Sequence, residues 1–258
     1  MQKPLIFVTN DDSIYANGID ALVQVAQTFG DVVVIAPDKP QSGMGHAITI
    51  NDPLRLMENN RWDGIKAFAC SGTPVDCVKL GIYEVLHQKP DLILSGINHG
   101  SNAATNVLYS GTMSAAVEGA LEGIPSIGFS LDDFEANADF SLAKYVVREV
   151  IENALKTDIP QGVCLNVNIP QVANADFKGI KVCRQAHAYW DDRFEKREDQ
   201  FGRTYYWLTG DFNQHEPGKD TDLYYLSQNY ATIVPTQFDL TAHETLTQLN
   251  EQFSKDEN

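Results

Sequence analysis

The stretch LIFVTNDDSIYANGIDALVQVAQTFGDVVVIA, residues 5–36, decides the fold class. Leu5–Thr9 is a short apolar run that stops at a polar turn, which is typical of a buried strand. Apolar residues then recur at helical spacing from Ile19 to Phe29, and Val32–Ala36 is a second apolar run. A strand, a helix and a strand in this order predict two parallel strands joined by a right-handed crossover.

The same alternation continues to about residue 155. Further strands are expected at Lys66–Ala69, Leu92–Leu94 and Ser126–Phe129. Helices are expected around Val75–Leu86, Thr112–Leu121 and Ser141–Leu155. The pattern therefore predicts an α/β protein with a doubly wound, mostly parallel sheet and helices on both faces.

The pattern changes beyond Gly162. Short strands follow without long helices between them, and a final helix is expected: Val163–Val167, Ile180–Val182, Tyr205–Leu208, Ala231–Val234 and the helix His243–Phe253. We therefore predict a catalytic core over residues 1–160 and a β-rich extension over residues 161–258. The extension would pack on the core or reach a neighbouring subunit.

Composition restricts the possible partners. The 258 residues include 35 acidic and 19 basic side chains, a formal net charge of −16. A surface of this sign repels nucleic-acid polymers and anionic lipid, so neither is an expected partner. No run approaches the roughly 18 apolar residues of a membrane span. A small anionic substrate still fits if a cation or a group of backbone N–H donors reverses the field locally.

The cysteine spacing and the absence of common enzyme motifs exclude several classes of protein. Cys70, Cys77, Cys164 and Cys183 form no C-x-x-C pair and have no metal-site spacing, so we expect reduced thiols in a cytoplasmic protein. The chain has no G-x-S-x-G elbow, no Walker loop and no G-x-G-x-x-G fingerprint.

The first candidate site is the adjacent pair Asp11 and Asp12, at the end of the first strand. Neighbouring side chains point to opposite faces within a strand, but at a turn both carboxylates can converge. Two such oxygen donors suit Mg²⁺ or Mn²⁺. The alternative is structural, with an aspartate that caps the next helix or closes an Asx turn.

Two further polar segments follow strands of the same sheet, where ligands bind in parallel α/β folds. After the second strand, Ser42 offers a neutral oxygen to a metal, although it could be an ordinary loop residue. The segment from Ser95 onward carries Asn98, whose carbonyl oxygen suits a metal, and Asn102, whose amide suits a phosphate. The turn Ser110-Gly111-Thr112 runs into a helix, which is the form of an anion site, or of a simple helix cap.

Together these segments resemble the SurE family of 5′/3′-nucleotidases. The likeness runs from about residue 4 to the Asp239-Leu240-Thr241 segment. The motifs that carry it occur in family order: Thr9-Asn10-Asp11-Asp12, Pro40-Gln41-Ser42-Gly43, Ser71-Gly72-Thr73-Pro74-Val75-Asp76-Cys77-Val78, Ser95-Gly96-Ile97-Asn98 and Tyr109-Ser110-Gly111-Thr112. Five motifs in one order are much more specific than any single one.

The resemblance implies a Rossmann-like core with a swapped C-terminal extension in a homodimer or homotetramer. It implies hydrolysis of nucleoside 5′- or 3′-monophosphates with one Mg²⁺ or Mn²⁺ ion per subunit. By position, the family's metal ligands fall on Asp11, Asp12, Ser42 and Asn98, and its phosphate contacts on Asn102, Ser110, Gly111 and Thr112. Asp11 is the expected base or water-orienting ligand, with Asp12 beside it in the catalytic pair.

The sequence departs from the family pattern at three places. Ser13 stands where the family usually has Gly, Ala104-Thr105-Asn106 replaces a common Gly-Asp-Asp, and Asp220-Thr221-Asp222 replaces Gly-Thr-Asp. A serine at the first place would be strained if that residue needs a positive φ. The departures leave open a metal- or nucleotide-binding protein without turnover. An aspartyl-phosphate mechanism is the other alternative, although it usually needs aspartates at i and i+2.

Overall fold

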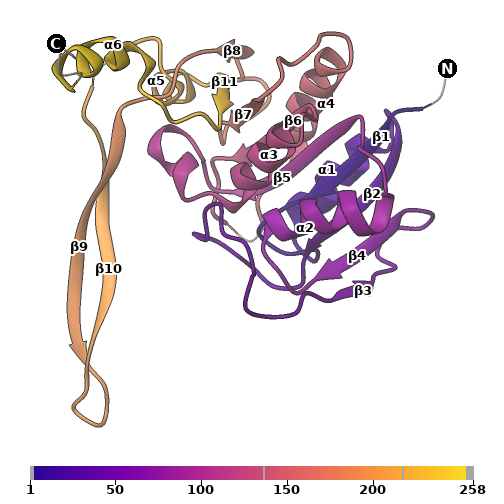
Figure 1. Cartoon of the computed structure of the whole chain (residues 1–258), viewed down its shortest axis with the longest axis horizontal. Coiled ribbons are helices and arrows are strands. Elements are labelled where there is room, and N and C mark those ends of the chain that lie inside the picture. The colour runs from indigo at the N-terminus through magenta and orange to yellow at the C-terminus, as the bar shows by residue number, and fades with distance from the viewer. Residues whose placement is uncertain (1–2, 136, 217, 254–258) are drawn as a thin grey trace, which may run out of the picture.

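The computed structural model describes residues 3–135, 137–216 and 218–253. Its main feature is a nine-stranded sheet in the order β3-β4-β2-β1-β5-β6-β7-β11-β8 (Figure 1). Its strands are β1 (Leu5–Thr9), β2 (Asp31–Pro37), β3 (Leu56–Glu58), β4 (Lys66–Cys70), β5 (Leu92–His99), β6 (Ser126–Leu131), β7 (Val163–Ile169), β8 (Ile180–Val182) and β11 (Ala231–Gln237).

The six strands from β4 to β7 in the sheet order are parallel to one another. Antiparallel pairs occur only toward the two sides of the described sheet, where β3 pairs with β4 and β11 pairs with β7. The carboxyl ends of β1, β2 and β5 therefore lie at one edge of the sheet. This is the edge at which the polar segments were expected.

Helices cover both faces of the sheet: α1 (Asn17–Ala26), α2 (Pro74–Leu80), α3 (Gly111–Leu121) and α4 (Ser141–Ala154). Strand β1 shows why, because alternate side chains point to opposite faces. Ile6 and Val8 pack in one hydrophobic cluster with α1 and α4, whereas Phe7 packs in another with residues of α2 and α3. The predicted α/β fold, doubly wound and mostly parallel, is confirmed.

Some elements differ from the expected ones. A π-helical turn, η1 (Gly81–Leu86), continues α2, and a 3₁₀ turn, η2 (Ala104–Leu108), precedes α3. Strand β5 runs to His99 rather than Leu94, because its polar residues still pair with β6 past an irregularity after Ser95. The short edge strand β3 was not expected.

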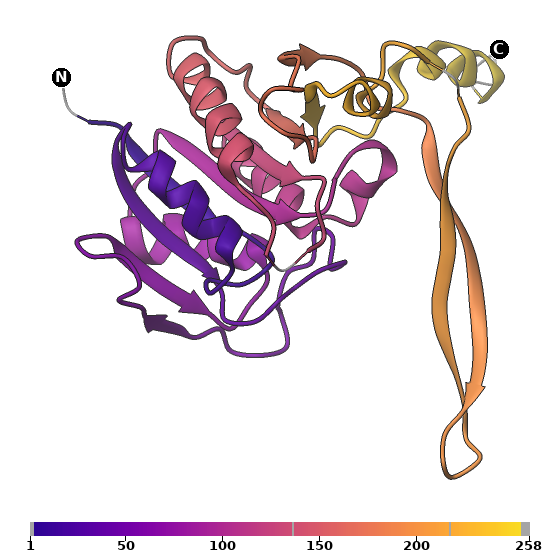
Figure 2. The same cartoon turned by 180° about the vertical axis from the view of Figure 1, so that it is seen from behind.

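The C-terminal part contains a long antiparallel hairpin, β9 (Ala188–Glu198) and β10 (Thr204–Gln214), which projects away from the sheet (Figures 1 and 2). Helix α5 (Asp222–Ser227) packs near β11, and α6 (His243–Phe253) ends the described chain. Because β7, β11 and β8 continue the main sheet, the hairpin and α6 are the parts that extend beyond it. The domain boundary at residue 160 stays a prediction.

No helix in the described ranges is long and apolar enough to cross a membrane. The four cysteines all lie within these ranges, and none of them is in a disulfide.

Candidate metal and anion site

The turn after β1 places the two aspartates at the carboxyl edge of the sheet. The Asn10 side chain closes this turn by donating from Nδ2 to the Ser13 carbonyl oxygen at 2.8 Å. Ser13 has a φ of 87°, in the region that favours glycine. The family's usual Gly at this position therefore has a physical reason, and Ser13 adopts a strained conformation in its place.

Asp11 lies against the N-terminus of α3. The Thr112 hydroxyl donates to Asp11 Oδ1 at 2.5 Å, although the two residues are 101 positions apart. A Cβ atom on Gly111 would lie only 2.7 Å from the Asp11 Cβ, so a glycine is needed for this close approach. The carboxylate and the predicted anion turn thus form one site.

Burial makes the two carboxylates unusual acids. Burial, with the charge of Asp12 as the second cause, raises the pKa of Asp11 from 3.8 to about 6, against the opposing effect of the Thr112 hydrogen bonds. Burial also raises the pKa of Asp12, although the His99 backbone N–H donates to its Oδ2 at 3.1 Å. A buried acid beside a half-buried one of the same charge is an arrangement that a cation would stabilise.

Backbone hydrogen bonds bring the other two predicted metal ligands to this turn. The Gln41 N–H donates to the Asp11 carbonyl oxygen at 2.7 Å, so the residue that precedes Ser42 is held against the aspartate turn. Asn98 is the residue before His99, which contacts Asp12. Its Nδ2 donates to the carbonyl oxygens of His99 and Gly100, so its Oδ1 is the atom available for a cation.

The donor set fits one hard divalent cation. It comprises two carboxylates, one hydroxyl and one carboxamide oxygen, all of which suit Mg²⁺ or Mn²⁺. The described residues contain no group of three or more His, Cys, Asp or Glu that could hold a metal, so any site here depends on neutral oxygens. In addition, the buried Oδ1 of Asn10 lacks a hydrogen-bond partner in the described part of the chain.

Ser110 is the N-cap of α3, where its Oγ accepts from the Met113 N–H at 3.0 Å. The Ser110 hydroxyl therefore acts as a simple helix cap, which was one of the two alternatives that the sequence left open for this turn. The Thr112 hydroxyl is instead committed to Asp11. The backbone N–H groups at the start of α3 remain the feature of this turn that suits an anion.

Asn102 belongs to a buried polar network that the sequence analysis missed. Its Nδ2 donates to Ser130 Oγ at 2.8 Å, and its backbone N–H donates to Asn168 Oδ1 at 2.7 Å. Asn166 in turn donates to the Asn102 carbonyl oxygen. A sequence pattern that could have predicted this network is present in β7, where two asparagines alternate with valine in an otherwise apolar strand. The Asn102 amide keeps one hydrogen for a ligand.

Two of the departures from the family pattern contact each other. The buried Asp222 carboxylate accepts from the backbone N–H groups of Ala104 and Ala186, at 2.8 and 2.9 Å. Ala104 has a φ of 53°, so it too occupies a backbone conformation that favours glycine. The adjacent Thr105 hydroxyl donates to the Ala188 carbonyl oxygen at 2.6 Å, at the start of the hairpin.

Another cluster that sequence reasoning missed joins the Ser42 loop to α2 and α3. The buried Glu118 carboxylate contacts His46 Nε2 at 2.8 Å and Lys79 Nζ at 2.5 Å. These partners lower the pKa of Glu118 despite its burial. No sequence pattern links three residues so far apart, because only the packing of α2 on α3 brings them together.

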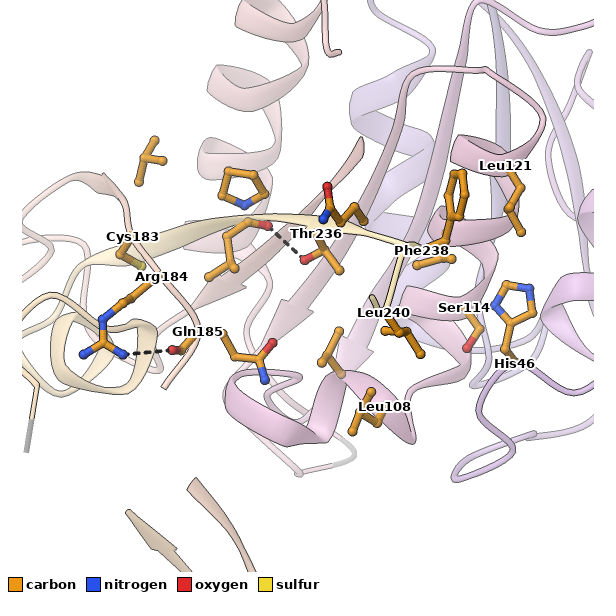
Figure 3. Close-up of a pocket in the computed structure, with 16 residues that line it drawn as sticks. His46, Leu108, Ser114, Leu121, Cys183, Arg184, Gln185, Thr236, Phe238 and Leu240 are labelled. Atoms are coloured by element: carbon orange, nitrogen blue, oxygen red, sulfur yellow. Dashed lines mark hydrogen bonds between the residues drawn. The ribbon is translucent and has the colours of Figure 1, made fainter. Parts of the chain in front are cut away.

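One cavity of the described structure has none of the aspartates in its lining. It has a volume of about 860 Å³ and runs from His46 and Ser114 to Phe238 and Leu240 (Figure 3). Figure 3 shows mainly apolar side chains around it, from η2, α3 and the segment around β11. The cavity contains none of the predicted metal ligands.

Fold and site together define a class: a Rossmann-like α/β protein with an acidic pair and a helix N-terminus at the carboxyl edge of its parallel sheet. The chain belongs to the SurE family, because the model described as "Survival protein SurE" matches residues 6–192. The resemblance drawn from the sequence motifs is therefore confirmed.

Full-length relatives and a solved structure agree with this assignment. The chain is 59% identical to the "5′-nucleotidase SurE" of Flavobacterium johnsoniae, over 96% of each protein. It is 55% identical to that of Cytophaga hutchinsonii, over 97% of each. The "Crystal Structure of Sure Protein from Aquifex aeolicus" shares 36% identity with a TM-score of 0.83, and the match covers 97% of this chain and all of that one.

Proposed function

We propose that the chain is a divalent-metal-dependent phosphomonoesterase that hydrolyses nucleoside 5′-monophosphates to nucleoside and phosphate. Nucleoside 3′-monophosphates are the second substrate class to test. The single observation that carries the proposal is the hydrogen bond from Thr112 to Asp11, which joins the buried member of the carboxylate pair to a helix N-terminus. The relatives named 5′-nucleotidase SurE support the substrate class.

Asp11, Asp12, Ser42 and Asn98 are the residues that would hold one Mg²⁺ or Mn²⁺ ion. When bound, the ion supplies a Lewis acid for a phosphoryl oxygen and lowers the pKa of a coordinated water. It also offsets the charge repulsion between a phosphate dianion and a protein of net charge −16. The proposal needs this offset, because the acidic chain would otherwise repel its substrate.

The remaining residues have distinct roles in this proposal. Asp11 orients the attacking water and accepts its proton, a role that suits a carboxylate with a pKa of about 6. Thr112 fixes the rotamer of Asp11. Gly111 and Ser110 present the start of α3 to the phosphoryl oxygens, and Asn102 donates to them with the amide hydrogen that Ser130 does not use.

We also propose that the protein is a cytoplasmic homodimer or homotetramer, in which the β9–β10 hairpin and α6 pack on a neighbouring subunit. The support is that α6 buries none of its residues, while Leu246 and Leu249 are 52% and 44% exposed. Exposed apolar side chains on an amphipathic helix favour a partner. The cytoplasm would keep the four free thiols reduced.

The test is phosphate release from a panel of nucleoside 5′- and 3′-monophosphates with Mn²⁺, with Mg²⁺ and with EDTA. We expect release that requires the metal and that EDTA abolishes. Binding of nucleotides without release under any metal would instead support the alternative, a binding protein of the same fold without turnover. Recovery of a phosphorylated aspartate would support the aspartyl-phosphate mechanism.

A further inference from the structure

A second cavity, of about 840 Å³, lies between the Ser42 loop, η2 and the hairpin. Gly43, Asn106, Tyr109, Tyr189 and Trp190 are among the residues that line it. Its volume is within the range of small-molecule sites, which is about 300–1,000 Å³. None of the residue roles proposed above uses this cavity.

The cavity directly adjoins the candidate metal and anion site. Gly43 follows Ser42 in sequence, and Tyr109 precedes Ser110. The Gly45 N–H donates to the Tyr109 carbonyl oxygen at 3.1 Å, so the two segments are hydrogen-bonded to each other beside the cavity. A phosphate held at the start of α3 would therefore have the rest of its molecule next to this space.

The walls of the cavity suit a flat aromatic ligand. Tyr109 is 61% exposed and Trp190 is 46% exposed, which is unusual for such large apolar side chains. Trp190 is nevertheless held in place, because its Nε1–H donates to Asn106 Oδ1 at 3.0 Å and its ring packs 5.5 Å from that of Phe212. An exposed ring that is already fixed loses little conformational entropy when a ligand stacks on it.

Asn106 adds a polar group to the same wall. Its Oδ1 accepts from Trp190, and its Nδ2 has no partner that the described residues supply. The amide hydrogens are therefore available to a carbonyl oxygen or a ring nitrogen of a ligand. An aspartate, which the family commonly has in this segment, would offer only acceptors.

We propose that this cavity binds the nucleobase of the substrate, with Trp190 as the stacking surface and Asn106 as a donor to the base edge. The inference rests on the proposed function, since it assigns the nucleoside half of the same substrate. The hairpin thus contributes to substrate selection as well as extending away from the sheet. Trp190 is a specificity residue here and takes no part in the phosphoryl chemistry.

The test compares two substrates that share the reacting group. Adenosine 5′-monophosphate has a base, and ribose 5-phosphate lacks one. In the Trp190→Ala variant, the ratio of kcat/KM for the nucleotide to kcat/KM for the sugar phosphate should fall by about tenfold or more, the size expected for loss of base stacking. Trp207→Ala is the matched control, because Trp207 is an exposed tryptophan of the same hairpin that does not line the cavity. It should leave the ratio unchanged.

Two more variants separate stacking from structural damage. Trp190→Phe keeps a ring but loses the bond to Asn106, so the ratio should fall by less than in Trp190→Ala. Asn106→Asp should change the ranking of different bases, because it replaces a donor with an acceptor. An unchanged ratio of kcat/KM values in Trp190→Ala would overturn the proposal. If that variant also forms a smaller oligomer, Trp190 is a subunit contact instead.

Failure of the proposed phosphatase function can be distinguished from failure of the nucleobase site. If the wild type releases phosphate from neither substrate, binding of both ligands is measured by calorimetry in the presence of Mn²⁺. The ratio of their dissociation constants in wild type and in Trp190→Ala then decides the nucleobase site alone. Equal preference for the two ligands in the wild type would overturn the proposal.

Discussion

The core and the protruding part of the C-terminal extension, which consists of the β9–β10 hairpin and α6, bury their side chains to very different extents. All six residues of β6 are buried in the sheet, whereas Ala188 is the only buried residue of β9 and β10 has none. Helix α4 buries six residues against the core, and α6 buries none. The core buries its apolar side chains within this chain, while the hairpin and α6 leave apolar side chains exposed.

This difference in burial matches the location of each part of the proposed function. The groups proposed to bind the metal and the phosphate lie on the core, at strand ends held by parallel pairing and by α3. The groups proposed for selection and assembly lie on the extension, or where it meets η2. Changes in the core should therefore affect the chemical step, and changes in the extension should affect specificity and assembly.

The largest expected effect is on the core. Asp11→Asn should lower kcat/KM for a nucleoside monophosphate by about a hundredfold or more, because it removes the base and a charged metal ligand together. The oligomer mass, measured by light scattering, should stay unchanged. Phosphate release with Mn²⁺ is the measurement.

Asp158→Asn is the control, because Asp158 is an exposed aspartate in the loop after α4. Near-native rates in the Asp11 variant would show that the aspartate pair is not the reacting centre. A change in oligomer mass would show that a substitution in the core also affects assembly.

The sequence predicted the buried core better than the exposed extension. The apolar runs of β1 and β2 predict their strands, because a strand buried on both faces needs such residues. Strand β9 escaped prediction, since its charged residues face solvent and carry no hydrophobic pattern. The Asp11 and Ser42 segments were recognisable as motifs, yet the contact of Asp11 with Thr112 depends on long-range packing. The His46–Glu118–Lys79 cluster had no local signal at all.

The next effect concerns the extension alone. Replacing both Leu246 and Leu249 by Asp should weaken the oligomer at least tenfold, because a buried leucine contributes roughly 1.5–3 kcal/mol. Sedimentation velocity over a range of protein concentrations measures the dissociation. Gln248→Asp adds a charge to the same helix at another exposed position and should have little effect. An unchanged oligomer in the double variant would remove α6 from the subunit interface.

A smaller effect should appear in the stability of the metal-free core. The folded-state pKa of Asp11 is about 6, above its ordinary value of 3.8, so the folded state binds more protons between these values. The free energy of unfolding contributed by this group therefore falls as pH rises from about 4 through 6. At pH 8 in EDTA, Asp11→Asn should be more stable than the wild type by on the order of 2 kcal/mol.

Urea unfolding at pH 4 and pH 8 measures this difference, which should nearly vanish at the lower pH. Added Mn²⁺ should stabilise the wild type more than the variant, because the ion binds the folded state of an intact site. The Asp158→Asn variant should follow the wild type throughout. A variant less stable than the wild type at pH 8 would mean that the Asp11 carboxylate has a stabilising partner besides Thr112.

The smallest effect compares two residues with positive φ, one in each region. Ser13, in the core, has a φ of 87°, and Asn229, between α5 and β11, has a φ of 68°. Serine pays about 1–2 kcal/mol for this conformation, whereas asparagine tolerates it. Because glycine also adds entropy to the unfolded chain, Ser13→Gly should gain only about 0.5 kcal/mol. Asn229→Gly should gain nothing or lose stability. Urea unfolding of both variants measures the difference, and a gain at Asn229 equal to that at Ser13 would show that relief of serine strain is not the cause.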